Sequence, residues 1–184
     1  MNTLIEEIAP LRDMGYISTQ VHPNMPLMIH NYTQRCQFDR HWNTTTLDCR
    51  GLITDMEGNI VCRPFPKFFN VEEHEAENSP LPELNWNQSF TVTEKMDGSL
   101  GILYESHDGL AIASRGSFTS EQAVEATRIF REKYGSFKPI PWCTYLFEII
   151  YPENRIVVDY GEMRDLVLID VINNSSRRSF PRPM

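Results

Sequence analysis

The chain has 184 residues and a formal net charge of −8 at neutral pH, with 41% hydrophobic and 11% aromatic residues. The length suits one domain with at most a small appendage, and the apolar share is sufficient for a core. The negative charge argues against a protein that coats nucleic acid through bulk positive charge, although a local basic groove is still allowed.

Neither the apolar runs nor the cysteines indicate a secreted or membrane-bound protein. No apolar run approaches the roughly 20 residues that span a bilayer, and residues 1–7 lack the basic start and apolar stretch of a signal peptide. The cysteines lie far apart and form no CxxC pair, which argues against a zinc site. We therefore expect a reduced, cytoplasmic protein without a membrane partner. These cysteines are Cys36, Cys49, Cys62 and Cys143.

The first half of the chain predicts one helix followed by short strands. Apolar residues at helical spacing predict a helix over residues 3–14, in which Pro10 should cause a break or kink. The other expected segments are a strand over residues 25–31, a hairpin over 46–63 with its turn at 57–59, an irregular aromatic segment over 64–70 and an acidic surface linker over 72–82.

The second half predicts more strands and one longer helix. The helix is expected over residues 120–133, because Val124, Ile129 and Phe130 can share one buried face. The expected strands cover residues 90–94, 100–104, 110–114, 144–150, 155–158 and 166–172, with a turn at 107–109 between the second and the third.

Many strands with only a few helices predict an α+β fold of mostly antiparallel sheets with a few flanking helices. We expect residues 1–172 to form one domain and residues 173–184 to form a polar, weakly ordered tail.

The most informative feature is Lys95, which lies in residues 94–101, EKMDGSLG. The run places an amine, a carboxylate two residues later and a Gly-Ser turn at the end of the strand predicted over residues 90–94. A lysine in such a setting can attack a nucleotide α-phosphate and carry the nucleotide as a phosphoramide. The alternative interpretation is an exposed lysine before a tight turn, since a short motif alone is only a hypothesis.

Other short blocks accompany this run in a fixed order. They are residues 49–52 (CRGL), 63–70 (RPFPKFFN), 94–101, 114–117 (SRGS), 147–150 (FEII) and 154–160 (NRIVVDY). The ordered set resembles the ATP-dependent RNA ligases of the phage RNA-repair type, within the covalent nucleotidyltransferase superfamily. DNA ligases and mRNA capping enzymes usually carry an arginine where this chain has Leu100, so the resemblance favours the RNA ligase branch.

The resemblance implies a nucleotidyltransferase (adenylation) domain and a reaction in three steps. Lys95 attacks the α-phosphate of ATP, and pyrophosphate leaves. The AMP then passes to an RNA 5′-phosphate, and an RNA 3′-hydroxyl attacks the activated end. The implied ligands are ATP, Mg²⁺ or Mn²⁺, and the two RNA ends.

Physical chemistry restricts what the lysine motif can do. Lys95 must be neutral to attack, although a free lysine has a pKa near 10.4, so burial, nearby cations or metal would have to lower it. A close carboxylate has the opposite effect, so we expect Asp97 to orient the lysine and to act in the later, metal-dependent steps. The alternative is that Asp97 only forms the turn before Gly98.

Three basic residues match phosphate-binding positions of the family. The resemblance assigns Arg50 and Lys67 to the triphosphate tail, where positive charge would stabilise departing pyrophosphate. Arg115 lies where relatives carry a lysine or arginine, and it could hold a phosphate with two hydrogen bonds. The alternative for each is an ordinary solvated charge.

Two carboxylates and two further residues complete the expected site. By resemblance, Glu148 contacts the ribose hydroxyls or a metal, because a carboxylate among apolar strand residues is costly unless it is paired or hydrogen-bonded. Glu94 would contact adenine mainly through its backbone. Val158 and Tyr160 could line the adenine site, but core packing explains them equally well. Glu148 could also be a strand-edge residue in water.

The resemblance also predicts a domain that is incomplete at its C-terminal end. The family normally continues with a glutamate-glycine block and a strand with two lysines separated by one residue, whereas no Glu or Lys follows Glu162 here. Three explanations are open. The chain is a fragment of a longer ligase, a second polypeptide completes the site, or the chain is a nucleotide- or RNA-end-binding remnant or partner subunit.

Overall fold

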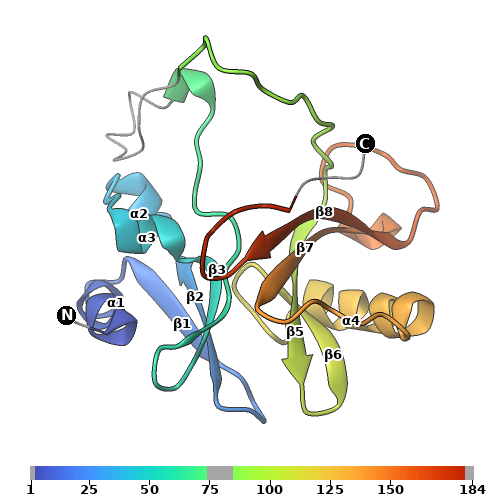
Figure 1. The fold of residues 1–184 in the computed structure, drawn as a ribbon, viewed down its shortest axis with the longest axis horizontal. Helices are drawn as coiled ribbons and strands as arrows, with labels where there is room; N and C mark the ends of the chain where they lie inside the picture. Colours follow the sequence, from blue (N-terminus) through green and yellow to red (C-terminus); the bar gives the residue numbers. More distant parts are fainter. Residues whose placement is uncertain (1–2, 74–84, 181–184) are drawn as a thin grey trace.

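The computed structural model describes residues 3–73 and 85–180, which form two four-stranded antiparallel sheets with helices on their outer faces (Figure 1). The strand orders are β1-β2-β3-β4 in the N-terminal sheet and β6-β5-β7-β8 in the C-terminal sheet. The predicted α+β class of mostly antiparallel sheets with a few flanking helices is therefore confirmed. Within these residues, no helix combines the length and the apolar character that a membrane crossing requires.

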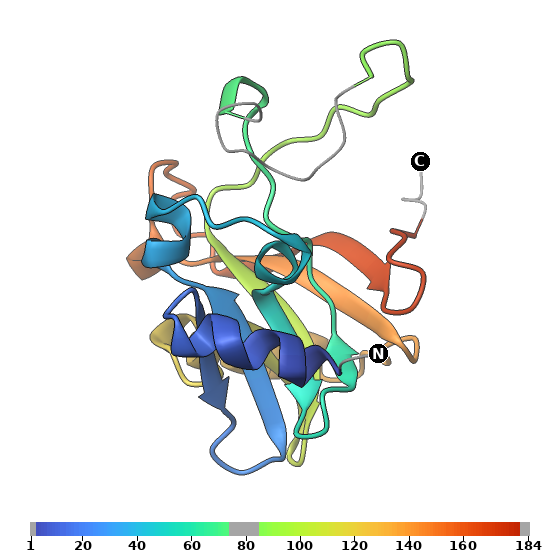
Figure 2. The same ribbon diagram turned by 90° about the vertical axis from the view of Figure 1, so that its left-hand side faces the viewer.

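The N-terminal sheet is covered on its outer face by a capped helix. Figure 2 shows α1 lying across this face. Thr3 and Glu6 form a capping box at the start of α1, and Ile8 and Leu11 pack against residues of the sheet. The elements are α1 (Leu4–Asp13), β1 (Ile17–Val21), β2 (Leu27–Tyr32), α2 (Gln34–Phe38), α3 (Thr44–Asp48), β3 (Arg50–Asp55) and β4 (Ile60–Cys62).

The predicted break in α1 at Pro10 is wrong, because the helix runs through this residue. Proline removes the hydrogen bond to the carbonyl of Glu6. Since Glu6 and Pro10 are both exposed, water can satisfy that carbonyl, so the loss does not end the helix.

The C-terminal sheet carries the longest helix on its outer face. Ser120 caps this helix, and Ala123, Ala126, Ile129 and Phe130 form its buried side. The predicted burial of Val124 is wrong, since its exposed fraction is 61%. The elements are β5 (Ser99–Ser106), β6 (Gly109–Ser114), α4 (Glu121–Tyr134), β7 (Cys143–Ile150) and β8 (Asp165–Asn173), with short 3-10 helices at Val71–Glu73 and Pro152–Asn154.

The core lies between the two sheets. Ile29 and Ile53 of the N-terminal sheet pack into one cluster with Ile102, Tyr104 and Leu146 of the C-terminal sheet. A second cluster lies between the C-terminal sheet and α4. The packing leaves one end of the sandwich lined by polar residues of both sheets, and this end holds the candidate site.

Two predicted strands are absent. Residues 90–94 and 155–158 form no ladder. Phe90 and Val92 are 78% and 83% exposed, so the apolar residues that suggested the first strand have no neighbouring strand to pack against.

The remaining differences concern short elements and the chain end. The predicted hairpin starts at Arg50, not at residue 46, because Asn43 caps the short helix α3 just before it. The predicted tail folds back through Phe180, whose amide donates to the carbonyl of Val171 at 2.9 Å. Residues 74–84, which hold most of the predicted acidic linker, and residues 181–184 lie outside the described residues.

Candidate functional site

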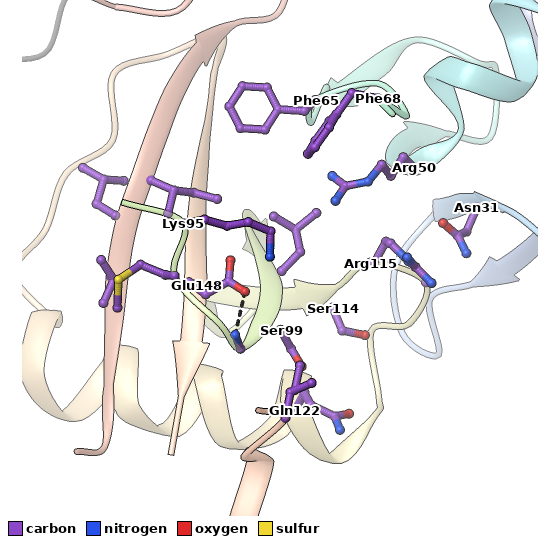
Figure 3. A pocket seen from close by; sticks show the side chains of 18 of the residues that line it. Asn31, Arg50, Phe65, Phe68, Lys95, Ser99, Ser114, Arg115, Gln122 and Glu148 are labelled. Carbon is purple, nitrogen blue, oxygen red and sulfur yellow. Dashed lines mark hydrogen bonds between the residues drawn. The ribbon is translucent and has the colours of Figure 1, made fainter. Parts of the chain in front are cut away.

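A cavity of about 1150 Å³ opens at the polar end of the two sheets (Figure 3). The N-terminal sheet contributes Asn31 and Arg50, and the C-terminal sheet contributes Ser99 and Glu148. The segment 93–96, which includes Lys95, lines the cavity as well. Because both sheets supply walls, packing of the sandwich core fixes the shape of the cavity.

Lys95 lies on an irregular segment just before β5, and it is exposed to the cavity. Figure 3 shows its side chain pointing into the same space as the carboxylate of Glu148. The segment is anchored at Gly98, whose amide donates to Oε1 of Glu148 at 3.0 Å. A Cβ at Gly98 would lie 2.4 Å from the carbonyl oxygen of Ile149, so only glycine permits this close approach to β7.

Arg50 is directed at the cavity by a bulge in β3. Gly51 has a φ of +89°, and the pairing with β2 shifts so that Arg50 lies opposite Asn31. The guanidinium lies 5.3 Å from the centre of the Phe68 ring, and its Nη1 has no hydrogen-bond partner. Burial lowers the pKa of Arg50 from its usual value, so the fold bears a cost for this partly buried charge.

Arg115 follows β6 and approaches the same wall of the cavity. Its Nη1 donates to the hydroxyl of buried Tyr32 at 3.5 Å, and its guanidinium lies 5.4 Å from the centre of that ring. Besides burial, Tyr32 raises the pKa of Arg50 and the charge of Arg115 lowers it. Both guanidinium groups therefore line the cavity close to Tyr32.

The basic groups of the cavity have no carboxylate within ion-pair distance among the described residues. In the parts of the chain that the structure describes, no ion pair within 4.0 Å includes Lys95, Arg50 or Arg115. Most other arginines of the described chain are paired, for example Arg128 with Glu125 and Glu132. Converging, unpaired cations in a cavity form a site for an anion.

Glu148 faces these cations from β7. Its carboxyl group is half-buried, and burial raises the pKa of Glu148, while the charges of Lys95 and Arg50 lower it. Glu94 also lines the cavity, but it is exposed.

Asp97 and Lys67 of the predicted site do not line the cavity, and neither do Val158 and Tyr160, which were considered for the adenine site. Asp97 turns away from it, and its Oδ2 accepts hydrogen bonds from the amides of Val157 and Val158 at 2.7 Å each. These bonds lower the pKa of Asp97. Lys67 precedes the lining residue Phe68, and its amine donates to the carbonyl of Phe68 at 2.8 Å and lies 4.3 Å from the ring centre of Phe69.

The structure thus brings together Lys95, Glu94, Arg50, Arg115 and Glu148, and it leaves Asp97 and Lys67 beside the cavity. It also adds wall residues that sequence reasoning did not identify. Phe65 and Phe68 belong to the aromatic block that holds Lys67, so that block was a usable signal. Asn31 belongs to no motif, and only its pairing with Arg50 brings it to the site.

A comparison with models of protein families decides to which family the chain belongs. The model described as RNA ligase matches residues 48–182. The chain belongs to the RNA ligase family. This match confirms the resemblance to RNA ligases of the phage type, and it spans every residue block that carried it.

Individual proteins named as RNA ligases are similar to this chain at modest sequence identity. "RNA ligase" of Rhodothermus phage RM378 is 28% identical over 184 residues, which cover 79% of this chain and 41% of the relative. "Putative RNA ligase" of Thermovibrio ammonificans is 28% identical over 134 residues, or 69% of this chain and 34% of the relative. A protein of Autographa californica nuclear polyhedrosis virus, named "Putative bifunctional polynucleotide kinase/RNA ligase", is 27% identical over 173 residues, which cover 82% of this chain and 24% of the relative. The chain spans less than half the length of each.

The cavity can be tested for its fit to a divalent cation. Among the described residues, no group of three or more His, Cys, Asp or Glu gathers. Mg²⁺ in nucleotide sites is usually held by one or two carboxylates together with phosphate oxygens and water. Glu148 and Glu94 meet that requirement, so the donor set fits a cation that arrives with a nucleotide.

Proposed function

We propose that this chain forms the nucleotidyltransferase (adenylation) part of an ATP-dependent RNA ligase. Lys95 is the nucleophile of this proposal, and Arg50 and Arg115 are the groups that hold the phosphates. Membership of the RNA ligase family supports the proposal, as does the cavity that gathers these residues. A cytoplasmic location, where ATP and broken RNA meet, is part of the proposal.

The first step transfers AMP to the protein. The neutral amine of Lys95 attacks the α-phosphorus of ATP, so an N–P bond forms while the bond between the α-phosphorus and the bridging oxygen breaks. Pyrophosphate leaves, and the amine loses a proton. Arg50 and Arg115 stabilise the negative charge that develops on the phosphates, and they cost little reorganisation because their fold already holds them in place.

The next two steps join RNA. The 5′-phosphate of one RNA end attacks lysyl-AMP, so AMP moves to the RNA and Lys95 is released. The 3′-hydroxyl of the other end then attacks the activated phosphate, and AMP leaves. Glu148 and Glu94 would hold Mg²⁺ or Mn²⁺ with the phosphates, and the cation would neutralise phosphate charge when bound. Lys67 and Asp97 stay in the proposal as groups beside the site.

One observation carries the proposal: three basic groups line the cavity with a half-buried Glu148, and none of the three forms an ion pair with a carboxylate of residues 3–73 or 85–180. Incubation with ATP and Mg²⁺ should add the mass of one AMP to the intact protein. Lys95→Arg keeps the positive charge but removes the nucleophilic amine, so it should abolish the adduct. Lys133→Arg, on the surface of α4, is the matched control and should be labelled normally. An unlabelled wild-type chain under every metal and pH tried would overturn the proposal.

A second candidate is a binding module that holds nucleotide or RNA ends without forming a covalent adduct. It is favoured by the exposure of Lys95, since water can reach the amine and the space where it would attack. Calorimetry with ATP and with 5′-phosphorylated RNA separates the candidates. Saturable binding without a mass change supports the module, and absence of binding excludes it.

A further inference from the structure

Residues 152–160 run beside the loop that carries Lys95 and hold it by side-chain contacts. The carboxylate of Asp97 accepts hydrogen bonds from two successive amides of this segment, those of Val157 and Val158. The amide of Asp97 donates in return to the hydroxyl of Tyr160 at 2.9 Å. A further contact follows in the chain, because the hydroxyl of Ser99 donates to Oδ1 of Asn154 at 3.1 Å.

These contacts matter because little else fixes the loop. Residues 90–97 belong to no strand, and Phe90 and Val92 are exposed. Lys95 itself is exposed, and within the described part of the chain its backbone forms no hydrogen bond. The loop becomes part of a sheet only at Ser99, so its last residues must be held by what they touch. Glu148 anchors Gly98 from one side, and the segment 152–160 anchors Asp97 from the other.

The segment has its own internal support, which lets it act as a fixed holder. Arg155 and Asp159 form an ion pair at 2.7 Å. The other carboxylate oxygen of Asp159 accepts from the amide of Gly161, which has a φ of +60° and closes the turn after Tyr160. Asn154 is tied to β7 through the carbonyl of Ile149 at 3.0 Å. The hydroxyl of Tyr160 is therefore presented to Asp97 from a turn that is already formed.

We propose that Tyr160 is a positioning residue for Lys95, which acts by accepting the hydrogen bond of the Asp97 amide, two residues after the nucleophile. This inference rests on the function proposed above. Neither Tyr160 nor Asp97 is among the residues that line the cavity of Lys95. Their contacts instead set where the lysine loop lies relative to β5 and β7. A displacement of about 1 Å at a nucleophile can cost about a hundredfold in rate without changing how the substrate binds.

The closing experiment combines kinetics with amide hydrogen exchange. Tyr160→Phe removes the hydroxyl and keeps the ring. Tyr134→Phe is the matched control, because Tyr134 of α4 donates its hydroxyl to Asp165 of β8 and neither residue lines the cavity. Single-turnover formation of lysyl-AMP gives a maximal rate and a half-saturating ATP concentration for each protein. Tyr160→Phe should lower the maximal rate by about tenfold or more and leave the half-saturating concentration within about twofold.

Hydrogen exchange, read by mass spectrometry on peptides that cover residues 94–99, tests the contact without any activity. Tyr160→Phe should speed exchange there, and Tyr134→Phe should not. Unchanged exchange, or faster exchange with an unchanged maximal rate, would overturn the positioning role. A rise in half-saturating ATP as large as the fall in rate would also overturn it. If the wild type forms no adduct, the proposed function fails. The exchange measurement still tests Tyr160 in that case, because faster exchange in Tyr160→Phe shows that Tyr160 holds the loop and unchanged exchange shows that it does not.

Discussion

The carboxylate of Glu148 accepts a hydrogen bond from the backbone amide of Gly98 at 3.0 Å, and this contact ties β7 to the loop that carries Lys95. Glu148 therefore has two properties that can be separated. It is a hydrogen-bond acceptor for the backbone, and it is a partly buried negative charge beside basic groups. The glutamine variant keeps the first property and removes the second.

The pH dependence of stability should reveal the buried charge of Glu148. Burial raises its pKa in the folded state above the unfolded value of 4.5, so the folded state holds this proton more tightly. The contribution of the protonated carboxyl group to the free energy of unfolding is therefore complete below the unfolded value, and it is lost as pH rises through the raised pKa of the folded state. The free energy of unfolding of the wild type, minus that of Glu148→Gln, should therefore fall from about pH 4 to about pH 7. Urea unfolding at both pH values measures it, and a difference that rises with pH would contradict the prediction.

The glycine of the lysine motif should be required for packing against β7. In Gly98→Ala, the new methyl group would meet the carbonyl oxygen of Ile149 at 2.4 Å, so the loop must move. We expect a loss of about 1–3 kcal/mol in the free energy of unfolding, together with loss of lysyl-AMP formation. Gly116→Ala is the control for stability, because its methyl group would meet Asn31 at an ordinary 3.6 Å. Urea unfolding and intact mass measure the two effects, and normal labelling of Gly98→Ala would contradict the argument.

Local patterns were enough to predict most of the elements and part of the site. The hairpin of β5 and β6 and the helix α4 follow from turn residues and apolar periodicity, which act over a few neighbours. Lys95, Arg50 and Arg115 were predicted from short blocks, and the fold brings them to one cavity. Their chemistry was visible because each lies in a block of specific composition.

What the sequence could not predict depends on partners far along the chain. The alternation of Phe90 and Val92 suggests a strand, but a strand needs a neighbour, and none lies there. Asp97 was expected to orient Lys95 directly, whereas amides about 60 residues later take up its carboxylate. The role of Asn31 at the cavity depends on its register with Arg50, which the bulge at Gly51 sets.

Arg50 should contribute to nucleotide binding at no benefit to stability. Its Nη1 has no partner, and burial lowers its pKa, so Arg50→Met should leave the free energy of unfolding unchanged within about 0.5 kcal/mol or raise it. A charged hydrogen bond to phosphate is worth about 1.5–3 kcal/mol, so the dissociation constant of ATP should rise by about 10- to 150-fold. Calorimetry and urea unfolding measure the pair of effects. Arg128→Met, on the surface of α4, should not weaken ATP binding, and equal ATP affinity of Arg50→Met and wild type would exclude Arg50 from the site.

Asp97 should act as a hydrogen-bond acceptor in the first step, and its charge should matter little there. Both amides, those of Val157 and Val158, donate to a single oxygen, which the side-chain oxygen of an asparagine can replace. Asp97→Asn should therefore retain most of the maximal rate of lysyl-AMP formation, within about threefold, since a neutral acceptor is weaker than a charged one. Asp97→Ala has no acceptor, so the loop loses its hold on residues 156–158 and the rate should fall by about tenfold or more.

The comparison of the two variants separates this role from an anionic one. If Asp97 acted through its charge on a cation or a proton in this step, asparagine and alanine would be equally inactive. Hydrogen exchange of the Val157 and Val158 amides gives a second reading, because it should be near that of the wild type in Asp97→Asn and faster in Asp97→Ala. A variant pair with equal rates and equal exchange would show that the carboxylate does not hold the lysine loop.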